Sequence, residues 1–329
     1  PLSKALREHY DEMIVHTGQH FDAEMSELFF KELEIPEPDI NLDINRGNHG
    51  EQTGRMLIEL EKVMLDYNPN LVIVFGDTNT TLAGALDAAK LHIPALHIEA
   101  GLRSFNRTMP EEINRILADQ AADYLFAPTR TAMGNLEKEG QDHKAFLTGD
   151  IMVDSLQFIL EKAKKRDTLK NLSLQNGYYL VTLHRPYNVD DPAKLQLILD
   201  KLAELDKEIV FPVHPRTRNM IENNKIKVPE TIKLIKPQGY LDFINLEAHC
   251  DKILTDSGGI QKEAYIHQKP CLTIRPETEW TETVEDGWNM LINPEHKEFV
   301  TKIKQFNPAT EQSDIFGKNV TERMAEVIR

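Results

Sequence analysis

Acidic side chains follow two short apolar runs in the first half of the sequence. The run at 71–75 (LVIVF) is followed by Asp77, and the run at 95–98 (ALHI) leads directly into Glu99. Glu111 comes shortly afterwards in the segment MPEEINR. Carboxylates grouped in this way can act as general acids and bases. A single Asp after a strand often only caps the next helix, so the catalytic interpretation depends on the group.

Groups that could bind an anion follow apolar runs in the second half. They are His184, Arg185, His214, Gln238 and Arg275. Arg115, four residues after Glu111, is a further cation in the first half. A lone strand-end histidine is usually structural, but two at equivalent places in one half favour contact with a ligand.

The segment DSGGIQKEA predicts a phosphate site. Ser257, Gly258 and Gly259 follow an apolar run and precede a predicted helix. Glycines allow a ligand to approach the backbone, and a helix N-terminus offers free N–H groups and a positive dipole end. Glu263, one turn into the helix, could accept hydrogen bonds from a ribose diol. The alternatives are a plain strand–helix turn and the serine nucleophile of trypsin-like proteases. The protease reading does not fit, because those proteins are all-β and rich in cysteine.

The elements that position these groups are predicted to alternate between strand and helix. Residues 71–98 form one βαβ unit with its helix at 81–90, and the unalternated run 71–75 is expected to be a strand buried on both faces. In open α/β sheets ligands bind beyond the carboxyl ends of the strands. Helices are also expected at 23–33, 48–65 and 152–172, and strands at 12–16, 178–183, 209–213, 232–235, 253–255 and 271–274. The fold class is therefore α/β, with two Rossmann-like domains facing each other across a cleft. The domains are expected at 1–155 and 156–312. Because residues 1–7 read as a helix, a strand and loop are expected before residue 1.

Composition restricts the partners. A length of 329 residues suggests two domains, and the net charge of −15 argues against nucleic acid or an anionic membrane as a partner. The two cysteines, Cys250 and Cys271, fit a reducing compartment, so a cytoplasmic location is expected. No metal-ligand spacing, Walker A loop or GxGxxG motif is visible, and we expect neither a metal nor another cofactor.

Long strings of the sequence resemble one enzyme family. HGEQTGRM, GDTNTTLAGALDAAKLHIPALHIEAGLRSFNRTMPEEINR, PVHPRT and LTDSGGIQKEA occur in the order found in the non-hydrolysing UDP-N-acetylglucosamine 2-epimerases. The resemblance covers nearly the whole chain. It implies the two-domain fold of B-type glycosyltransferases, with a C-terminal helix at about 313–329 returning to the first domain. It also implies a UDP-sugar substrate, a homodimer and a role in making precursors of surface polysaccharides.

The resemblance implies roles for individual residues. The family's catalytic carboxylates fall on Asp77, Glu99 and Glu111, and its catalytic histidine falls on His184. Its UDP contacts fall on Arg115, His214, Phe243 on the uracil side, Ser257, Gly258 and Glu263. Gln19 and Arg55 match a second, activating UDP-sugar site of some members, although Asp22 stands where those members have Gln. Tyr187 and Trp280 replace a Glu and an Arg that many members have near the ligand, and the Trp form resembles the branch that acts on UDP-diacetamido-uronic acids.

The residue types suit an elimination reaction. The C2 hydrogen of the sugar is barely acidic, so loss of UDP to give 2-acetamidoglucal, followed by re-addition, is the expected route from UDP-GlcNAc to UDP-ManNAc. This route needs a base, an acid for the opposite face and stabilisation of the departing diphosphate. Three alternatives stay open: a UDP-2,3-diacetamido-2,3-dideoxyglucuronate 2-epimerase, a retaining nucleotide-sugar glycosyltransferase and a catalytically silent nucleotide-sugar sensor.

Overall fold

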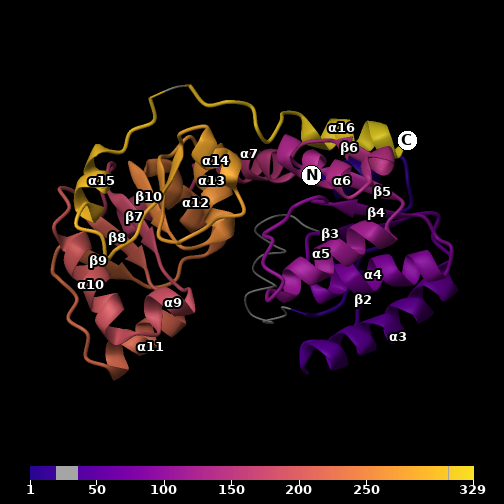
Figure 1. The fold of residues 1–329 in the computed structure, drawn as a ribbon, viewed down its shortest axis with the longest axis horizontal. Helices are drawn as coiled ribbons and strands as arrows, with labels where there is room; N and C mark the ends of the chain where they lie inside the picture. The colour runs from indigo at the N-terminus through magenta and orange to yellow at the C-terminus, as the bar shows by residue number, and fades with distance from the viewer. Residues whose placement is uncertain (20–35, 310) are drawn as a thin grey trace. The chain divides into compact units, whose positions relative to one another are not determined.

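The chain folds into two compact α/β units. A computed structural model describes residues 1–19, 36–309 and 311–329. The first unit comprises Pro1–Ser155 and Asp314–Arg329, and the second comprises Leu156–Ser313 (Figure 1). The helix expected at 23–33 lies outside the described residues. The predicted α/β class with parallel sheets in two units is confirmed.

The first unit contains a four-stranded parallel sheet in the order β3-β4-β5-β6. Its strands are β3 (Val72–Phe75), β4 (Ala95–Ile98), β5 (Tyr124–Ala127) and β6 (Ala145–Leu147). Phe75 pairs with Ile98, so the residues that follow β3 and β4 emerge side by side at one edge. A separate parallel pair joins β1 (Val15–His16) to β2 (Ile40–Asn41).

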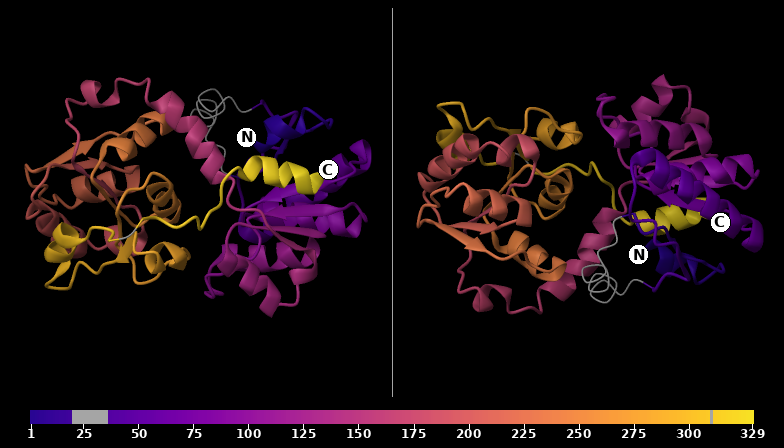
Figure 2. Two further views of the ribbon diagram at one scale, coloured as in Figure 1. Left: turned by 90° about the horizontal axis from the view of Figure 1, so that it is seen from above. Right: turned by 90° about the horizontal axis from the view of Figure 1, so that it is seen from below.

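Several helices and one 3-10 turn accompany the strands of the first unit. They are α1 (Leu2–Leu6), α3 (His49–Tyr67), α4 (Asn79–Lys90), α5 (Pro110–Ala121), α6 (Arg130–Lys138), the 3-10 turn η1 (Asp142–Lys144) and α16 (Val320–Ile328). The Thr129 side chain accepts from the Ala132 N–H and caps α6. The C-terminal helix α16 packs on this unit through Val320 and Met324, beside Leu2 and Leu6 of α1 (Figure 2).

The second unit contains a six-stranded parallel sheet in the order β12-β11-β10-β7-β8-β9. Its strands are β7 (Tyr179–Thr182), β8 (Ile209–Pro212), β9 (Ile232–Ile235), β10 (Lys252–Thr255), β11 (Cys271–Thr273) and β12 (Asn289–Leu291). Successive strands extend the sheet from β7 in one direction and from β10 in the other. The strand order therefore reverses between β7 and β10, where open α/β sheets bind their ligands.

Helices connect these strands and cover two hydrophobic clusters. They are α8 (Thr168–Asn171), α9 (Pro186–Val189), α10 (Pro192–Ala203), α11 (Pro215–Asn223), α12 (Tyr240–His249), α13 (Gly258–Ile266), α14 (Thr281–Glu285) and α15 (Phe299–Gln305). The larger cluster includes Leu199, Phe211 and Phe299, and the other includes Tyr178, Leu180 and Leu246. Neighbouring strand residues such as Leu180 and Val181 are both fully buried, as expected for a sheet covered on both faces.

Three local predictions are wrong in part. The expected strand at 12–16 is paired only at Val15–His16, and the expected helix at 152–172 divides into α7 (Met152–Ala163) and α8. The run 71–75 is not buried on both faces: in the edge strand β3, Val72 and Ile73 are half-buried and Phe75 is 52% exposed. Among the helices of the described residues, none is long and apolar enough to cross a membrane.

Asp87 on α4 provides a test of the packing of the first unit. It is buried, and within the described residues its Oδ2 atom has no hydrogen-bond partner. Burial, together with the charge of Glu61, raises the pKa of Asp87 from 3.8 to about 6. Because this pKa lies above the unfolded value, the folded state binds the extra proton, and stability falls as pH rises from about 4 to 6.

We expect Asp87→Asn to raise the melting temperature at neutral pH and to change it little near pH ~4. Calorimetric melting at both pH values is the check, and an equal gain at both would refute the burial of the charge.

Candidate active site

Asp77 lies at the carboxyl edge of the first sheet and does not cap the helix that follows. Thr78 is the N-cap of α4, and its side chain accepts from the Thr81 N–H. The Asp77 carbonyl accepts a hydrogen bond of 3.0 Å from the Asn114 side chain, and its carboxylate pairs with Arg115. The Asp77 side chain is about one-third exposed, so one face of the carboxylate stays open to a ligand. The helix-cap interpretation therefore does not apply to Asp77.

Glu99 follows β4 in a strained conformation. Its φ is 72°, a region that residues other than glycine rarely adopt and that recurs at functional sites. Gly76, with a φ of 67°, ends β3 beside it, and Glu99 Oε2 lies 3.5 Å from the position a Gly76 Cβ would occupy. The two strand ends therefore hold the acidic residues 77 and 99 close together.

The neighbouring acids of α5 have different environments. Glu112 is buried and accepts hydrogen bonds from the backbone of Ser104 and Phe105, at 2.9 Å each, and from Arg115. Glu111 lies on the exposed side of the same turn. Glu112 therefore anchors the preceding loop and holds Arg115, while Glu111 remains available to a ligand. The helix begins at Pro110, so both acids lie in its first turn.

In the second unit, His184 follows β7 and is oriented by Asp256, which follows β10. Asp256 has no exposed surface, and it accepts from the backbone N–H groups of His184 and Arg185 and from the Asn188 side chain. His184 Nδ1 lies 3.2 Å from Asp256 Oδ1. Burial, with the nearby charges of Arg185, His214 and Arg216, lowers the pKa of His184, although Asp256 opposes this. The ring is therefore held neutral and oriented, as a proton carrier requires.

Further cations lie at the same edge of this sheet. The His214 ring lies 5.8 Å from the His184 ring, and its Nδ1 accepts from the Arg216 N–H at the start of α11. Arg185 Nε is buried without a hydrogen-bond partner in the described parts of the chain, as expected of a group that waits for an anionic ligand. Arg275 follows β11 and pairs with Glu279 at 2.9 Å.

The glycine-rich turn opens α13 directly after β10. Ser257 occupies the N-cap position, and its side chain makes no capping hydrogen bond. A Cβ on Gly258 would lie 2.1 Å from Glu279 Oε1, so this position has no room for a larger residue as the Glu279 side chain stands. Gly259 is exposed and its Cβ direction is open. The start of this helix offers the donors that a diphosphate needs.

Glu263 lies one turn into α13 within a group of acidic side chains. It is nearly buried, and the Tyr240 hydroxyl donates to its Oε1 at 2.8 Å. Burial raises the pKa of Glu263, and burial with the adjacent Glu263 charge raises that of Glu247 well above its usual range. Two other predicted contacts lie on this side: Phe243 on α12 packs partly on the hydrophobic cluster around Leu246, and the Gln238 amide donates to the Lys236 carbonyl.

The predicted regulatory residues lie in the first unit. Gln19 Oε1 accepts from the Thr80 backbone N–H at 3.1 Å, and Thr80 Oγ1 also contacts Met56. Arg55, the neighbour of Met56 on α3, is exposed. Gln19 therefore contacts α4 through Thr80, whereas Arg55 is the exposed neighbour of a residue that contacts Thr80.

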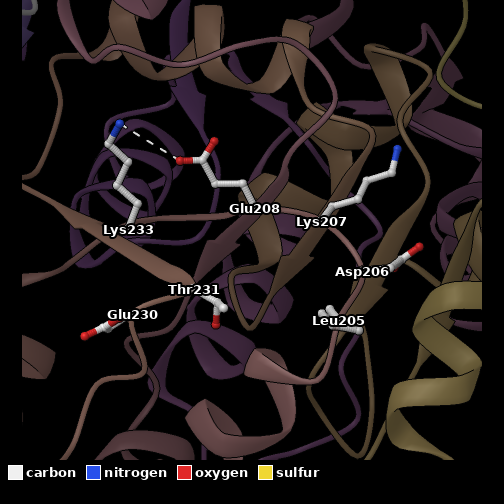
Figure 3. A pocket seen from close by; sticks show the side chains of 7 residues that line it. All are labelled: Leu205, Asp206, Lys207, Glu208, Glu230, Thr231 and Lys233. Atoms are coloured by element: carbon white, nitrogen blue, oxygen red, sulfur yellow. Dashed lines mark ion pairs between the residues drawn. The ribbon is translucent and has the colours of Figure 1, made fainter.

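The cavity of about 340 Å³ in the second unit is separate from these groups. It lies at the amino ends of β8 and β9, at the opposite edge of the sheet from His184 and His214 (Figure 3). Its lining residues are Leu205, Asp206, Lys207, Glu208, Glu230, Thr231 and Lys233. Elsewhere in the described ranges, His, Cys, Asp and Glu side chains form no group of three that could hold a metal ion.

Sequence reasoning missed the buried groups that orient the predicted ones. Asp256, Asn188 and Asn114 touch predicted site residues and are themselves buried. Asp256 was visible in the DSGG string, but its contact with His184 spans 72 positions. Such contacts depend on strand order, which the sequence does not state.

Comparison with known proteins points to one family. The sequence model of a family described as UDP-N-acetylglucosamine 2-epimerase matches residues 4–329. A UDP-N-acetylglucosamine 2-epimerase homolog of Methanococcus maripaludis is 48% identical over 100% of this chain and 95% of its own. A UDP-2,3-diacetamido-2,3-dideoxy-D-glucuronate 2-epimerase of Pseudomonas aeruginosa is 48% identical over 99% of this chain and 94% of its own. The crystal structure of Methanocaldococcus jannaschii UDP-GlcNAc 2-epimerase with UDP-GlcNAc and UDP has a TM-score of 0.88 at 44% identity, covering 100% of this chain and 94% of that one.

Proposed function

Because the chain belongs to the UDP-N-acetylglucosamine 2-epimerase family, we propose that it interconverts UDP-GlcNAc and UDP-ManNAc without hydrolysis, supplying precursors for surface polysaccharides. The observation that carries this proposal is the pair of strand-end carboxylates, Asp77 and Glu99, held together by the turns at Gly76 and Glu99. Epimerisation at C2 requires acids and bases that reach both faces of that carbon. Closely spaced carboxylates in one sheet edge can supply them.

The second unit is proposed to bind UDP. Its strand order reverses between β7 and β10, and the start of α13 lies at that point. The diphosphate would be held by the N–H groups of the α13 N-terminus, by Ser257 and by the cations Arg185 and His214. Glu263 would accept from the ribose hydroxyls. The net charge of −15 does not prevent this, because local donors outweigh the global charge at short range.

Removal of single contacts in the second unit should weaken UDP binding. We expect Ser257→Ala and Glu263→Gln each to cost about 1–3 kcal/mol, the usual effect of losing a charge-assisted hydrogen bond. Isothermal titration calorimetry with UDP measures this. Glu230→Gln, at the opposite edge of the same sheet, is the matched control and should bind UDP as the wild type does. If both the Ser257 and the Glu263 variants bind UDP with full affinity, the UDP site must be assigned to another part of the chain.

The proposed reaction proceeds by elimination and re-addition. A carboxylate of the first unit removes the C2 proton, the C1–O bond breaks, and UDP leaves with the bonding electrons to give 2-acetamidoglucal. C2 then gains a proton on its opposite face while UDP re-forms the C1–O bond. Asp77, Glu99, Glu111 and His184 are the proposed catalytic set. The proton transfers are assigned to this set as a whole.

A UDP-diacetamido-uronic acid is the second candidate substrate. The observation that favours it is the 48% identity to the Pseudomonas aeruginosa enzyme over nearly the whole chain. Trp280 stands where many family members have an Arg; it is buried, and Lys262 Nζ lies 4.5 Å from its ring centre. The replacement removes one cation from the segment that also carries Glu279 and changes what that segment offers the sugar.

Separate incubations with the two UDP-sugars decide between the candidates. Proton NMR of the anomeric region follows the appearance of the C2 epimer of each sugar. We expect kcat/KM to be larger for UDP-GlcNAc. A larger value for the diacetamido-uronate would transfer the assignment to that substrate, and turnover of neither sugar would refute epimerase activity.

A further inference from the structure

His97 is a fully buried residue of β4 whose two ring nitrogens both contact acceptors. Its Nε2 lies 2.7 Å from the carbonyl oxygen of Gly76, and its Nδ1 lies 2.6 Å from Asp119 Oδ1. A backbone carbonyl can only accept, so Nε2 must carry a proton. The state of Nδ1 depends on whether Asp119 is ionised.

Asp119 is held as a carboxylate by several donors. Besides the His97 ring, it accepts from the Gly101 N–H at 3.1 Å and from Arg103 at 2.7 Å, and it has no exposed surface. Arg103 in turn makes a bidentate pair with Glu139, at 2.8 and 2.7 Å. Burial alone would raise the pKa of Asp119, but the bonds and charges of His97 and Arg103 leave it lowered. Because the Gly101 N–H and Arg103 also donate to Asp119, its carboxylate acts as an acceptor, and the His97 ring donates through both nitrogens.

The bond to Gly76 places this network directly beneath the proposed catalytic acids. Gly76 is the residue before Asp77, and Glu99 follows His97 by two positions. The Gly76 N–H donates to the Ile98 carbonyl at 3.1 Å, so the Gly76 residue is fixed through both its N–H and its carbonyl. Glu99, whose φ of 72° is strained for a residue other than glycine, follows the ring by two positions. Strain of this kind persists only where surrounding groups hold the backbone.

We propose that His97 is a positioning residue for the reaction, and that its doubly protonated ring fixes the Gly76 carbonyl and thereby sets Asp77 against Glu99. This inference rests on the proposed function, since it gives His97 a task within that reaction. Stability alone does not require such a residue, because well-packed apolar side chains often serve at least as well as a buried ion pair. Partners that orient catalytic or metal-binding groups typically contribute ~10–100-fold to activity.

Two variants and one matched control test the proposal in the full-length chain. His97→Leu removes both hydrogen bonds, whereas His97→Gln keeps one amide group that can donate to the Gly76 carbonyl. The control, Asn135→Leu, removes a buried 3.0 Å bond to the neighbouring Gly101 carbonyl and leaves Gly76 untouched. We expect His97→Leu to lower kcat by ~10–100-fold with a much smaller change in KM, and His97→Gln to recover part of the loss. UDP affinity should be unchanged in both, and Asn135→Leu should lose stability but keep most of its kcat.

A second readout does not depend on activity. With ¹⁵N-labelled histidine, the ligand-free wild type should show two ring N–H signals at neutral pH that disappear in His97→Gln. If His97→Gln loses only one ring N–H signal relative to the wild type, the proposed protonation of both His97 nitrogens is wrong, whether or not the enzyme turns over. Equal kcat losses in His97→Leu and Asn135→Leu variants of equal stability would overturn the positioning role.

Discussion

Replacing Asp77 with Asn is expected to lower kcat by at least ~10²-fold, the usual cost of losing a general acid or base. The substitution keeps the shape of the side chain and the backbone bond from Asn114, but it removes the carboxylate. It also breaks the charge pair with Arg115, which keeps its contact with Glu112. UDP affinity should survive, because the proposed nucleotide contacts lie mainly in the second unit. Initial rates and UDP calorimetry on the same preparation measure both quantities.

Asp123→Asn is the matched control for this result. The Asp123 carboxylate accepts a 2.9 Å hydrogen bond from the Ala95 N–H, at the amino end of β4 and therefore at the opposite edge of the same sheet. Its kcat should stay close to that of the wild type. If Asp77→Asn retains full kcat while Asp123→Asn does not, the catalytic edge has been assigned to the wrong end of the sheet.

Replacing His184 with Gln should also lower kcat by at least ~10²-fold, because a glutamine side chain cannot carry the proton. The pKa of His184 is lowered from 6.5 by burial and by its cationic neighbours, so the ring is neutral at and above that pH. Where the reaction uses the neutral ring, the wild-type rate should fall only as pH drops below about 6.5.

Asp256→Asn tests the role of His184 by removing the charge of the carboxylate that lies beside its ring. The Asp256 charge raises the pKa of His184, so its removal should shift the acid limb of the pH–rate profile to lower pH. The rate itself should fall as well, because Asn cannot accept all the bonds from His184, Arg185 and Asn188. A shift of the acid limb to higher pH would contradict the proposed effect of the Asp256 charge on His184.

Much of the fold could be predicted because strand and helix signals in this sequence are local. The βαβ unit at 71–98 has an unbroken apolar strand, a Thr cap and an amphipathic helix, and its elements form close to the predicted bounds. The helix at 48–65 and the strand-end polar clusters of the second half are equally local signals. The prediction was wrong at Phe75, because an apolar run alone does not show that its strand lies at the edge of the described sheet.

The orientation of the site groups could not be predicted because it depends on the register of a helix or on contacts between distant positions of the sequence. Glu111 and Glu112 are adjacent and chemically alike, and only the register of α5 buries Glu112 and exposes Glu111. His97 lies within a string that resembles the family, but nothing around it in the sequence indicates a role, because its proposed task depends on Gly76 and Asp119, which lie 21 and 22 positions away. The sequence pointed to the residues that are proposed to meet a ligand, whereas their orientation comes from the packed fold.

Hydrogen exchange at C2 during turnover is the most direct test of the proposed mechanism. The full-length protein is incubated with UDP-GlcNAc in deuterated water, and NMR follows C2 of both epimers. Elimination and re-addition predict that solvent deuterium enters C2 of the product and that a little free UDP and 2-acetamidoglucal accumulate. If the product epimer forms while C2 keeps its original hydrogen, proton removal by the carboxylate set is refuted.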